Sequence, residues 1–145
     1  MIAALLAPVA LIAQAQAYTP GQFAALKFLE GRWTGTAPDG TAFFERYDFP
    51  DPATMRMRRF ADPNFVAMSD ETKVVLADGR IGGRWDDHDW QVVELADGMV
   101  RFEAGDASGG FSLRRIDTNT IEVMQRSRGP KGKPQVHASV LHRLK

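Results

Sequence analysis

Six polar side chains of this sequence alternate with apolar ones in segments that are patterned as β-strands. Side chains two positions apart lie on the same face of a strand, so each polar group shares a face with apolar neighbours. The six residues are Glu45, Tyr47, Arg59, Glu94, Arg115 and Gln125. Such a face is typical of a pocket for a mainly apolar ligand. Arg59 or Arg115 could hold a carboxylate through two hydrogen bonds, so one expectation is a ligand with an anionic end.

Apolar residues on the same strand faces are expected to form the pocket walls. They are Phe43, Phe49, Met55, Met57, Trp90, Val92, Phe111, Leu113, Ile121 and Val123, with Val136, Ala138, Val140 and His142 on the last strand. The predicted ligand-binding residues are Tyr47, Met57, Arg59, Trp90, Glu94, Phe111, Arg115 and Gln125. Two alternatives stay open: the Glu and Arg residues pair with each other near the barrel ends, or large side chains fill the interior completely. A single β-bulge would also reverse the face that a strand presents.

Catalytic motifs are absent from the sequence. There is no Cys, which excludes thiol catalysis and Cys-based zinc sites. The Ser and Thr residues have no nucleophile-elbow context such as G-x-S-x-G. Glu45, Glu94 and His142 could act as general acids or bases, but nothing in the sequence orients them. We therefore assign no catalytic residue, and a small enzyme on this fold stays as an alternative that depends on fold analogy.

The densest acidic cluster is Asp86-Asp87-His88-Asp89. Carboxylates with an imidazole could bind a divalent cation. The cluster lies between two Trp-bearing segments, however, and Asp is a common turn residue. We interpret it as a turn and predict no metal site.

Turn signals divide the chain after residue 30 into short segments. Asp39-Gly40, Asp78-Gly79 and Asp97-Gly98 predict tight hairpins, because Asp-Gly accepts the positive φ that such turns need. Gly82-Gly83 predicts a bulge or sharp bend within a strand. The predicted strands are residues 31–37, 41–49, 54–60, 71–76, 80–85, 90–95, 99–104, 110–116, 120–127 and 135–143. This series predicts an all-β fold, an antiparallel up-and-down barrel of eight to ten strands.

One short N-terminal helix is predicted over residues 20–30. Thr19 can cap it, and Pro20 suits its first turn. Phe23, Leu26 and Leu29 recur every three residues, and Gly31 ends the helix as a residue that tolerates positive φ. We expect this helix to close one end of the barrel.

Residues 28–35 read FLEGRWTG. This segment resembles the F-L-x-G-x-W-x-G start of lipocalin-like (calycin) barrels, among them uncharacterised bacterial exported families. The resemblance implies that Trp33 plugs the closed end of the barrel and that a basic residue of the last strand packs across it. Arg143 is the candidate, and a guanidinium over an indole face gains roughly 0.5–2 kcal/mol. The motif indicates the fold more strongly than the function.

The same segment is similar, more weakly, to the start of nitrobindin-type domains, which bind haem through a His on the last strands. His137 lies in a comparable region. The Gly-rich, Tyr-Pro-containing continuation typical of nitrobindins is absent after Gly35. We therefore predict no cofactor, and haem ligated by His137 is the alternative.

The charges of the chain balance, with 18 basic and 18 acidic side chains. A neutral domain has no broad electrostatic surface for nucleic acid or for anionic membranes. We expect a monomer or weak dimer whose partner is a small hydrophobic or amphipathic molecule. A further alternative is an exported interaction or inhibitor module that uses loops 61–69 and 128–134, with Phe60, Phe65 and Met68 exposed as anchors.

The first 17 residues carry no charge and end in Ala15-Gln16-Ala17, an A-x-A cleavage signal. The apolar run is shorter than the roughly 20 residues of a membrane span, and Pro8 interrupts it. We therefore predict a signal peptide over residues 1–17 and a barrel domain over residues 18–145, periplasmic or secreted and without stable membrane insertion after processing. The segment departs from the usual pattern because it lacks an N-terminal Lys or Arg.

Processing after Ala17 can be measured directly. We expect protein purified from its native host to have the intact mass of a chain that begins at Tyr18, because the apolar segment and the Ala-Gln-Ala sequence together specify cleavage there. Retention of residues 1–17 in the mature protein would contradict this prediction.

Overall fold

The structure is a computed structural model that describes residues 17–145. Apart from Ala17, the predicted signal peptide lies outside these residues. A short α-helix, Pro20–Phe23 (α1), continues into a 3-10 helix, Ala24–Leu29 (η1). The ten strands are β1 (Gly31–Thr36), β2 (Ala42–Asp51), β3 (Thr54–Phe60), β4 (Met68–Ala77), β5 (Arg80–Trp85), β6 (His88–Ala96), β7 (Met99–Ala104), β8 (Gly109–Asp117), β9 (Thr120–Arg128) and β10 (Pro134–Leu144), with a 3-10 turn, η2 (Pro130–Gly132), before the last. Within this part of the chain, no helix is long and apolar enough to cross a membrane.

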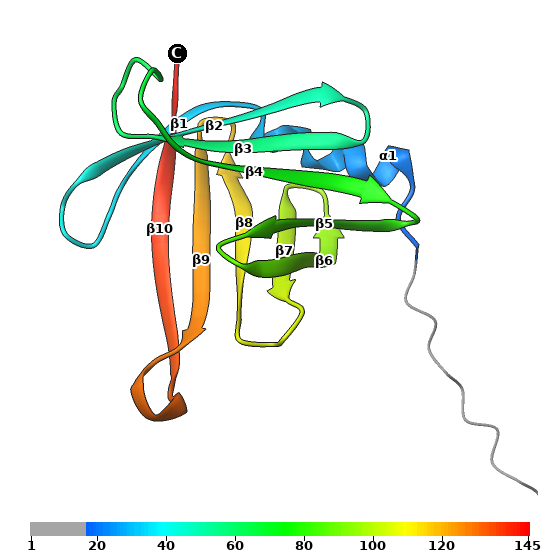
Figure 1. The fold of residues 1–145 in the computed structure, drawn as a ribbon. Helices are drawn as coiled ribbons and strands as arrows, with labels where there is room; N and C mark the ends of the chain where they lie inside the picture. The colour runs from blue at the N-terminus through cyan, green and yellow to red at the C-terminus, as the bar shows by residue number, and fades with distance from the viewer. Residues whose placement is uncertain (1–16) are drawn as a thin grey trace, which may run out of the picture.

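The strands form one closed barrel (Figure 1). Each strand pairs antiparallel with its neighbours in the sequence, and β1 also pairs with β10, which closes the sheet. Trp33 on β1 lies opposite Arg143 on β10 and opposite Glu45 on β2. The prediction of an all-β, up-and-down antiparallel barrel is therefore confirmed, with ten strands in the segments that the turn signals marked.

Two of the hairpins have left-handed backbone at both turn residues. Asp78 and Gly79 have φ of 51° and 73°, and Asp86 and Asp87 have φ of 50° and 61°. Asp and Gly tolerate this conformation better than most residues. The acidic cluster at 86–89 is thus built around a two-residue turn. Among residues 17–145, no group of three His, Asp or Glu side chains is placed to hold a metal ion.

Gly82-Gly83 continues its strand without a bulge. The two residues lie opposite Gln91 and Trp90 in unbroken register, so the predicted bulge is wrong. A Cβ atom on Gly83 would lie 2.3 Å from the carbonyl oxygen of Lys73. Glycine is needed here because β4 and β5 approach each other closely. The register shifts occur elsewhere, at Asp48/Asp51, Arg59/Phe60, Val92/Glu94 and Arg115/Asp117.

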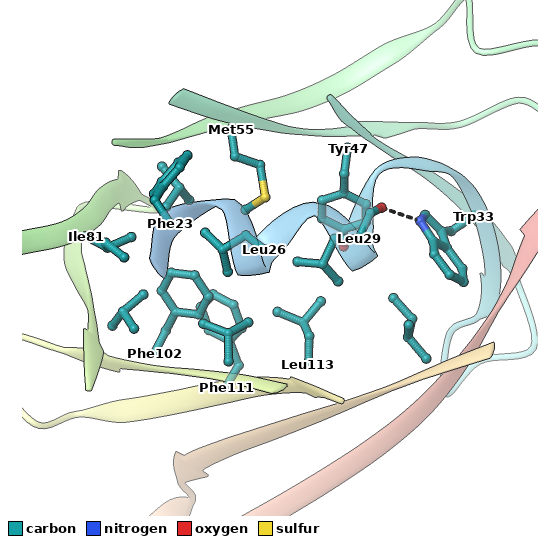
Figure 2. Packing of buried hydrophobic residues seen from close by; sticks show 14 of the residues in the cluster. Phe23, Leu26, Leu29, Trp33, Tyr47, Met55, Ile81, Phe102, Phe111 and Leu113 are labelled. Carbon is teal, nitrogen blue, oxygen red and sulfur yellow. Dashed lines mark hydrogen bonds between the residues drawn. The ribbon is translucent and has the colours of Figure 1, made fainter. Parts of the chain in front are cut away.

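The helical segment begins with a capping box between Thr19 and Gln22. The Gln22 backbone N–H donates to the Thr19 hydroxyl, and the Thr19 backbone N–H donates to the Gln22 side chain, at 3.2 and 2.9 Å. Beyond Phe23 the helix tightens to 3-10 geometry, which has three residues per turn. Phe23, Leu26 and Leu29 therefore lie on one face, and all three are buried in the barrel core (Figure 2).

Trp33 seals the end of the barrel next to this helix. Its indole N–H donates to the carbonyl oxygen of Leu29 at 2.8 Å, as the dashed line in Figure 2 shows. Arg143 lies over the indole ring, with its guanidinium carbon 4.2 Å from the ring centroid. The guanidinium also donates to the carbonyl oxygens of Phe28 at 3.2 Å and Glu30 at 2.5 Å. Arg143 thus joins the last strand to the first and to the end of the helix.

Truncation of Trp33 tests its role as the plug. We expect Trp33→Ala to lower the free energy of unfolding by roughly 3–5 kcal/mol, because the indole is fully buried and a cavity would replace it. The control Ile116→Ala, at an exposed position, should change it by no more than about 0.5 kcal/mol. Denaturant unfolding of both variants gives the values, and equal effects would show that Trp33 is not a plug.

Candidate functional site

A hollow remains inside the barrel beyond the core. Its volume is about 60 Å³, less than half of the roughly 150 Å³ of an engineered cavity that binds benzene. The lining residues come from β2 to β8 and are Glu45, Tyr47, Met57, Arg58, Arg59, Asp70, Thr72, Val74, Gly83, Trp85, Trp90, Phe102 and Phe111. We call this space the inner hollow. Its presence shows that the large apolar side chains do not fill the barrel interior completely.

Aromatic side chains form one wall of the inner hollow. The ring centroids of Trp85 and Trp90 are 6.2 Å apart, and Phe111 lies 5.2 Å from Trp90. Phe111 in turn stacks on Phe102 at 4.6 Å with an angle of 13° between the ring planes. The Trp90 indole N–H donates to the Trp85 carbonyl oxygen at 3.1 Å. The rings are thus fixed by one another, and they offer apolar surface to the hollow.

A hydrogen-bonded chain of Tyr47, Glu45 and Arg59 borders the inner hollow. The Tyr47 hydroxyl donates to one carboxylate oxygen of Glu45. The other oxygen accepts from Arg59 through Nε at 3.1 Å and Nη2 at 2.5 Å. The Arg59 guanidinium also lies over the ring of Phe43, 4.8 Å from its centroid. Burial raises the pKa of Tyr47 well above its ordinary value, and the Glu45 charge raises it further. Tyr47 is therefore a neutral donor here.

Asp70 faces the same hollow from β4. It lies opposite Arg59 in the sheet, and its carboxylate accepts a hydrogen bond from the Trp85 indole N–H at 2.5 Å. Sequence reasoning missed Asp70 because it lies before the predicted strand 71–76, and it missed Thr72 and Trp85 because no inward face is assigned to the predicted strands 71–76 and 80–85. The apolar Val74 was a usable signal, because a buried Val74 places Thr72 and Asp70 on the same inward face of the strand.

The mouth of the barrel carries two further hollows that share residues with the first. One of about 140 Å³ lies among Phe43, Glu45, Arg59, Gln125 and His137. The other, of about 720 Å³, extends from the two Trp residues to Gln125 and His137. His137 is exposed, and its Nε2 lies 3.3 Å from the Ser139 hydroxyl. His137 and Gln125 therefore belong to the mouth and do not line the inner hollow.

Five predicted site residues line the inner hollow: Tyr47, Met57, Arg59, Trp90 and Phe111. Two others do not, for different reasons. A register shift at Val92/Glu94 changes the face that follows it, so the Glu94 carboxylate is exposed and faces Arg101 at 3.4 Å. Arg115 is in register with Leu113 but lies at the helix end of the barrel, where it pairs with Asp97 at 3.1 Å and lies over the Phe28 ring. Neither residue can contact a ligand in the hollow.

The face of the last strand is opposite to the one expected. Leu141 is buried, and His137 and Ser139 on the same face line the mouth. Val136 and Val140, expected inside, are 64% and 46% exposed. Val136, Ala138 and Val140 alternate along β10 with His137, Ser139 and Leu141, so the period alone does not say which set faces inward. The prediction that the Val, Ala, Val set lies inside is wrong.

Two of the three residues expected as exposed interaction anchors pack against the protein itself. Phe60 is buried, and its ring centroid lies 5.2 Å from that of Phe65. Phe65 also contacts Phe44 at 6.1 Å and lies under the Arg32 guanidinium at 5.5 Å. Only Met68 of the three is exposed. Loop 61–69 is thus anchored to the outer face of the barrel by its aromatic residues.

The pKa of Tyr47 gives a measurable signature of this site. An unfolded Tyr loses its proton near pH 10, whereas native Tyr47 keeps it to higher pH. Its contribution to stability is therefore present below about pH 10 and is lost as the pH rises further. We expect the difference in phenolate absorbance between wild type and Tyr47→Phe to appear only well above pH 10. A Tyr47 transition near pH 10 in the folded protein would contradict the arrangement.

No protein-family model and no curated protein matches this chain. Among solved structures, it is similar to Rv2717c from M. tuberculosis, with 15% identity over 88% of this chain and 99% of that chain and a TM-score of 0.49. It is also similar to EF1p2_mFAP2b bound to DFHBI, with 13% identity, 85% and 99% coverage and a TM-score of 0.43. A redesigned β-barrel, b11L5F_LGL, gives 13% identity, 83% and 96% coverage and a TM-score of 0.41. At these values the similarities assign neither a family nor a ligand to the chain.

Proposed function

We propose that this domain is a binding protein for a small, mainly apolar molecule that occupies the inner hollow. The observation that carries the proposal is the aromatic wall of Trp85, Trp90 and Phe111, which faces empty space inside an otherwise filled barrel. Protein interiors are close-packed, with few voids larger than a water molecule. The part of the hollow along the aromatic wall is a poor place for water and a good one for an apolar group.

The size of the inner hollow limits the ligand. The inner hollow is smaller than the roughly 150 Å³ cavity that holds benzene, so a ligand with an aromatic ring must extend from it into the larger mouth hollow, which shares Trp85 and Trp90. Met57 lines the hollow beside the aromatic wall. Its flexible side chain can adapt to ligands of different shape. We infer a loosely specified pocket for a flat apolar group.

An anionic end on the ligand finds little support. That expectation depended on a free guanidinium at Arg59 or Arg115. Arg59 already binds Glu45 through two nitrogens, and Arg115 pairs with Asp97 far from the hollow. A ligand carboxylate would have to displace Glu45, which would then lose its cationic partner. The proposal is therefore a ligand with an apolar body and no carboxylate in the inner hollow.

Two further parts of the proposal concern cofactor and location. We infer that the ligand is bound without haem, because the inner hollow, where we place the ligand, has no His among its lining residues in the described part of the chain, and His137 lies at the mouth. We also propose export to the periplasm or the medium. The uncharged N-terminal segment and its Ala-Gln-Ala sequence support this location.

Filling the hollow tests the proposed function. Thr72 lines the hollow, and Lys73 next to it is exposed on the same strand. We expect Thr72→Phe to abolish binding of 2-phenylethanol, measured by calorimetric titration, because the new ring occupies the ligand space. The matched control Lys73→Phe should bind as wild type does.

Two results would contradict the proposal. One is wild-type protein that binds no small apolar probe and carries no molecule in native mass spectrometry after purification from its host. The other is Thr72→Phe that folds, by its circular dichroism spectrum, and still binds the probe with unchanged affinity.

A further inference from the structure

The geometry points to a ligand that carries a protonated amino group, held by Asp70 at the aromatic wall of the inner hollow. This inference rests on the proposed function and specifies the chemical class of the ligand. It starts from the one carboxylate of the hollow that the protein leaves without a cation.

Asp70 and Glu45 are the two carboxylates that line the inner hollow, and their partners differ. Glu45 is neutralised by Arg59, with a closest distance of 2.5 Å. Asp70 accepts a hydrogen bond from the neutral Trp85 indole N–H, and no Lys, Arg or His of residues 17–145 lies within ion-pair distance of it. An ionised carboxylate has about four acceptor positions. Asp70 therefore keeps acceptor capacity for a charged donor.

The other cations of the site are held elsewhere. The Arg59 guanidinium is fixed between Glu45 and the ring of Phe43. Arg58 also lines the hollow, but its guanidinium pairs with Asp48. Asp48 lies on the opposite face of β2 from Glu45 and Tyr47. With Arg59 paired to Glu45 and Arg58 to Asp48, Asp70 is the carboxylate of the hollow that makes no ion pair among the residues that the structure describes. A ligand ammonium would supply the missing partner.

The aromatic wall favours the same ligand charge. Faces of Trp and Phe rings attract cations, and the attraction grows when the cation is partly removed from water. Trp85 connects the carboxylate to the aromatic wall. Its indole N–H donates to Asp70, and its ring packs edge to face with Phe111 at 6.1 Å. A ligand with an aromatic body and a short aminoalkyl arm could contact the wall and Asp70 together. A carboxylate in the same place would be repelled by Asp70.

The rim of the mouth carries charges of both signs. The connections after β1, β3, β5 and β7 each contain Asp, and the connection after β9 carries Lys131 and Lys133. Asp87 faces Arg84 at 3.9 Å, and Asp106 faces His88 at 3.3 Å. The preference for an ammonium group therefore depends on Asp70 and the aromatic wall.

Three probes of the same size test the inference. They are 2-phenylethylammonium, 2-phenylethanol and phenylacetate, titrated calorimetrically at pH 7 into the folded domain. We expect the ammonium probe to bind at least about tenfold more tightly than the alcohol, the ratio typical of a charge-assisted hydrogen bond. Phenylacetate should bind most weakly.

Asp70→Asn locates the effect. The amide oxygen can still accept the Trp85 indole N–H, so the pocket shape is kept while the charge is removed. We expect the ammonium-to-alcohol ratio to fall to about one, with alcohol binding retained. The control Asp89→Asn removes a carboxylate that is 72% exposed and faces Arg84. It should leave the ratio as in wild type.

The outcomes separate the two proposals. If the alcohol binds as tightly as the ammonium, or phenylacetate binds best, the amine inference is wrong and the apolar-ligand function stands. If none of the three probes binds wild type, both are wrong. If Asp70→Asn folds and keeps a tenfold preference for the ammonium, another group is responsible and the role of Asp70 is overturned. The wild-type comparison decides the ligand class even if that variant fails to fold.

Discussion

The stacking of Arg143 on Trp33 is the contact on which the barrel depends. It lies where β1 meets β10, the junction that converts an open sheet of ten strands into a closed one. The same guanidinium donates hydrogen bonds to the backbone carbonyl oxygens of Phe28 and Glu30. The last carbonyl oxygens of a helix have no partner within the helix, so an outside donor is needed there. One side chain thus fixes strand closure, the position of the plug and the end of the helix. Gly31 takes part because a Cβ atom there would lie 2.5 Å from Arg143 Nη1.

The filled end of the barrel explains why the hollow lies at the other end. Phe23, Leu26 and Leu29 enter the core from the helical segment, with Leu29 beside Trp33 and Phe23 at the other end of the segment, near Ile81 (Figure 2). Past Tyr47, the strands enclose volume that only their own side chains can fill, and there polar Glu45, Arg59 and Asp70 replace the aliphatic core. The hollow therefore begins where these polar residues meet the aliphatic core.

Much of the fold was predictable because its signals are local. Asp-Gly pairs and alternating side chains located all ten strands, and the helix–GRW junction located the plug. The site was predictable only where a strand runs without interruption, as for Tyr47 on β2 and Met57 on β3. Glu94 failed because the shift in β6 depends on how β7 pairs with it, which is a property of two strands. Sequence alternation alone could not choose the inner face of β10, since both faces carry apolar residues.

The chain Tyr47–Glu45–Arg59 has a consequence for how such a protein can diversify. It borders the inner hollow, and through Tyr47 it also packs against the buried core. Substitutions at Asp70, Thr72 or Trp90 change surfaces that face the hollow and do not touch Leu26, Leu29 or Trp33. Because core packing supplies most of the stability of a small domain without disulfides, the pocket can acquire new chemistry at little cost in folding. Recognition and stability can then be changed through largely different residues of a single barrel.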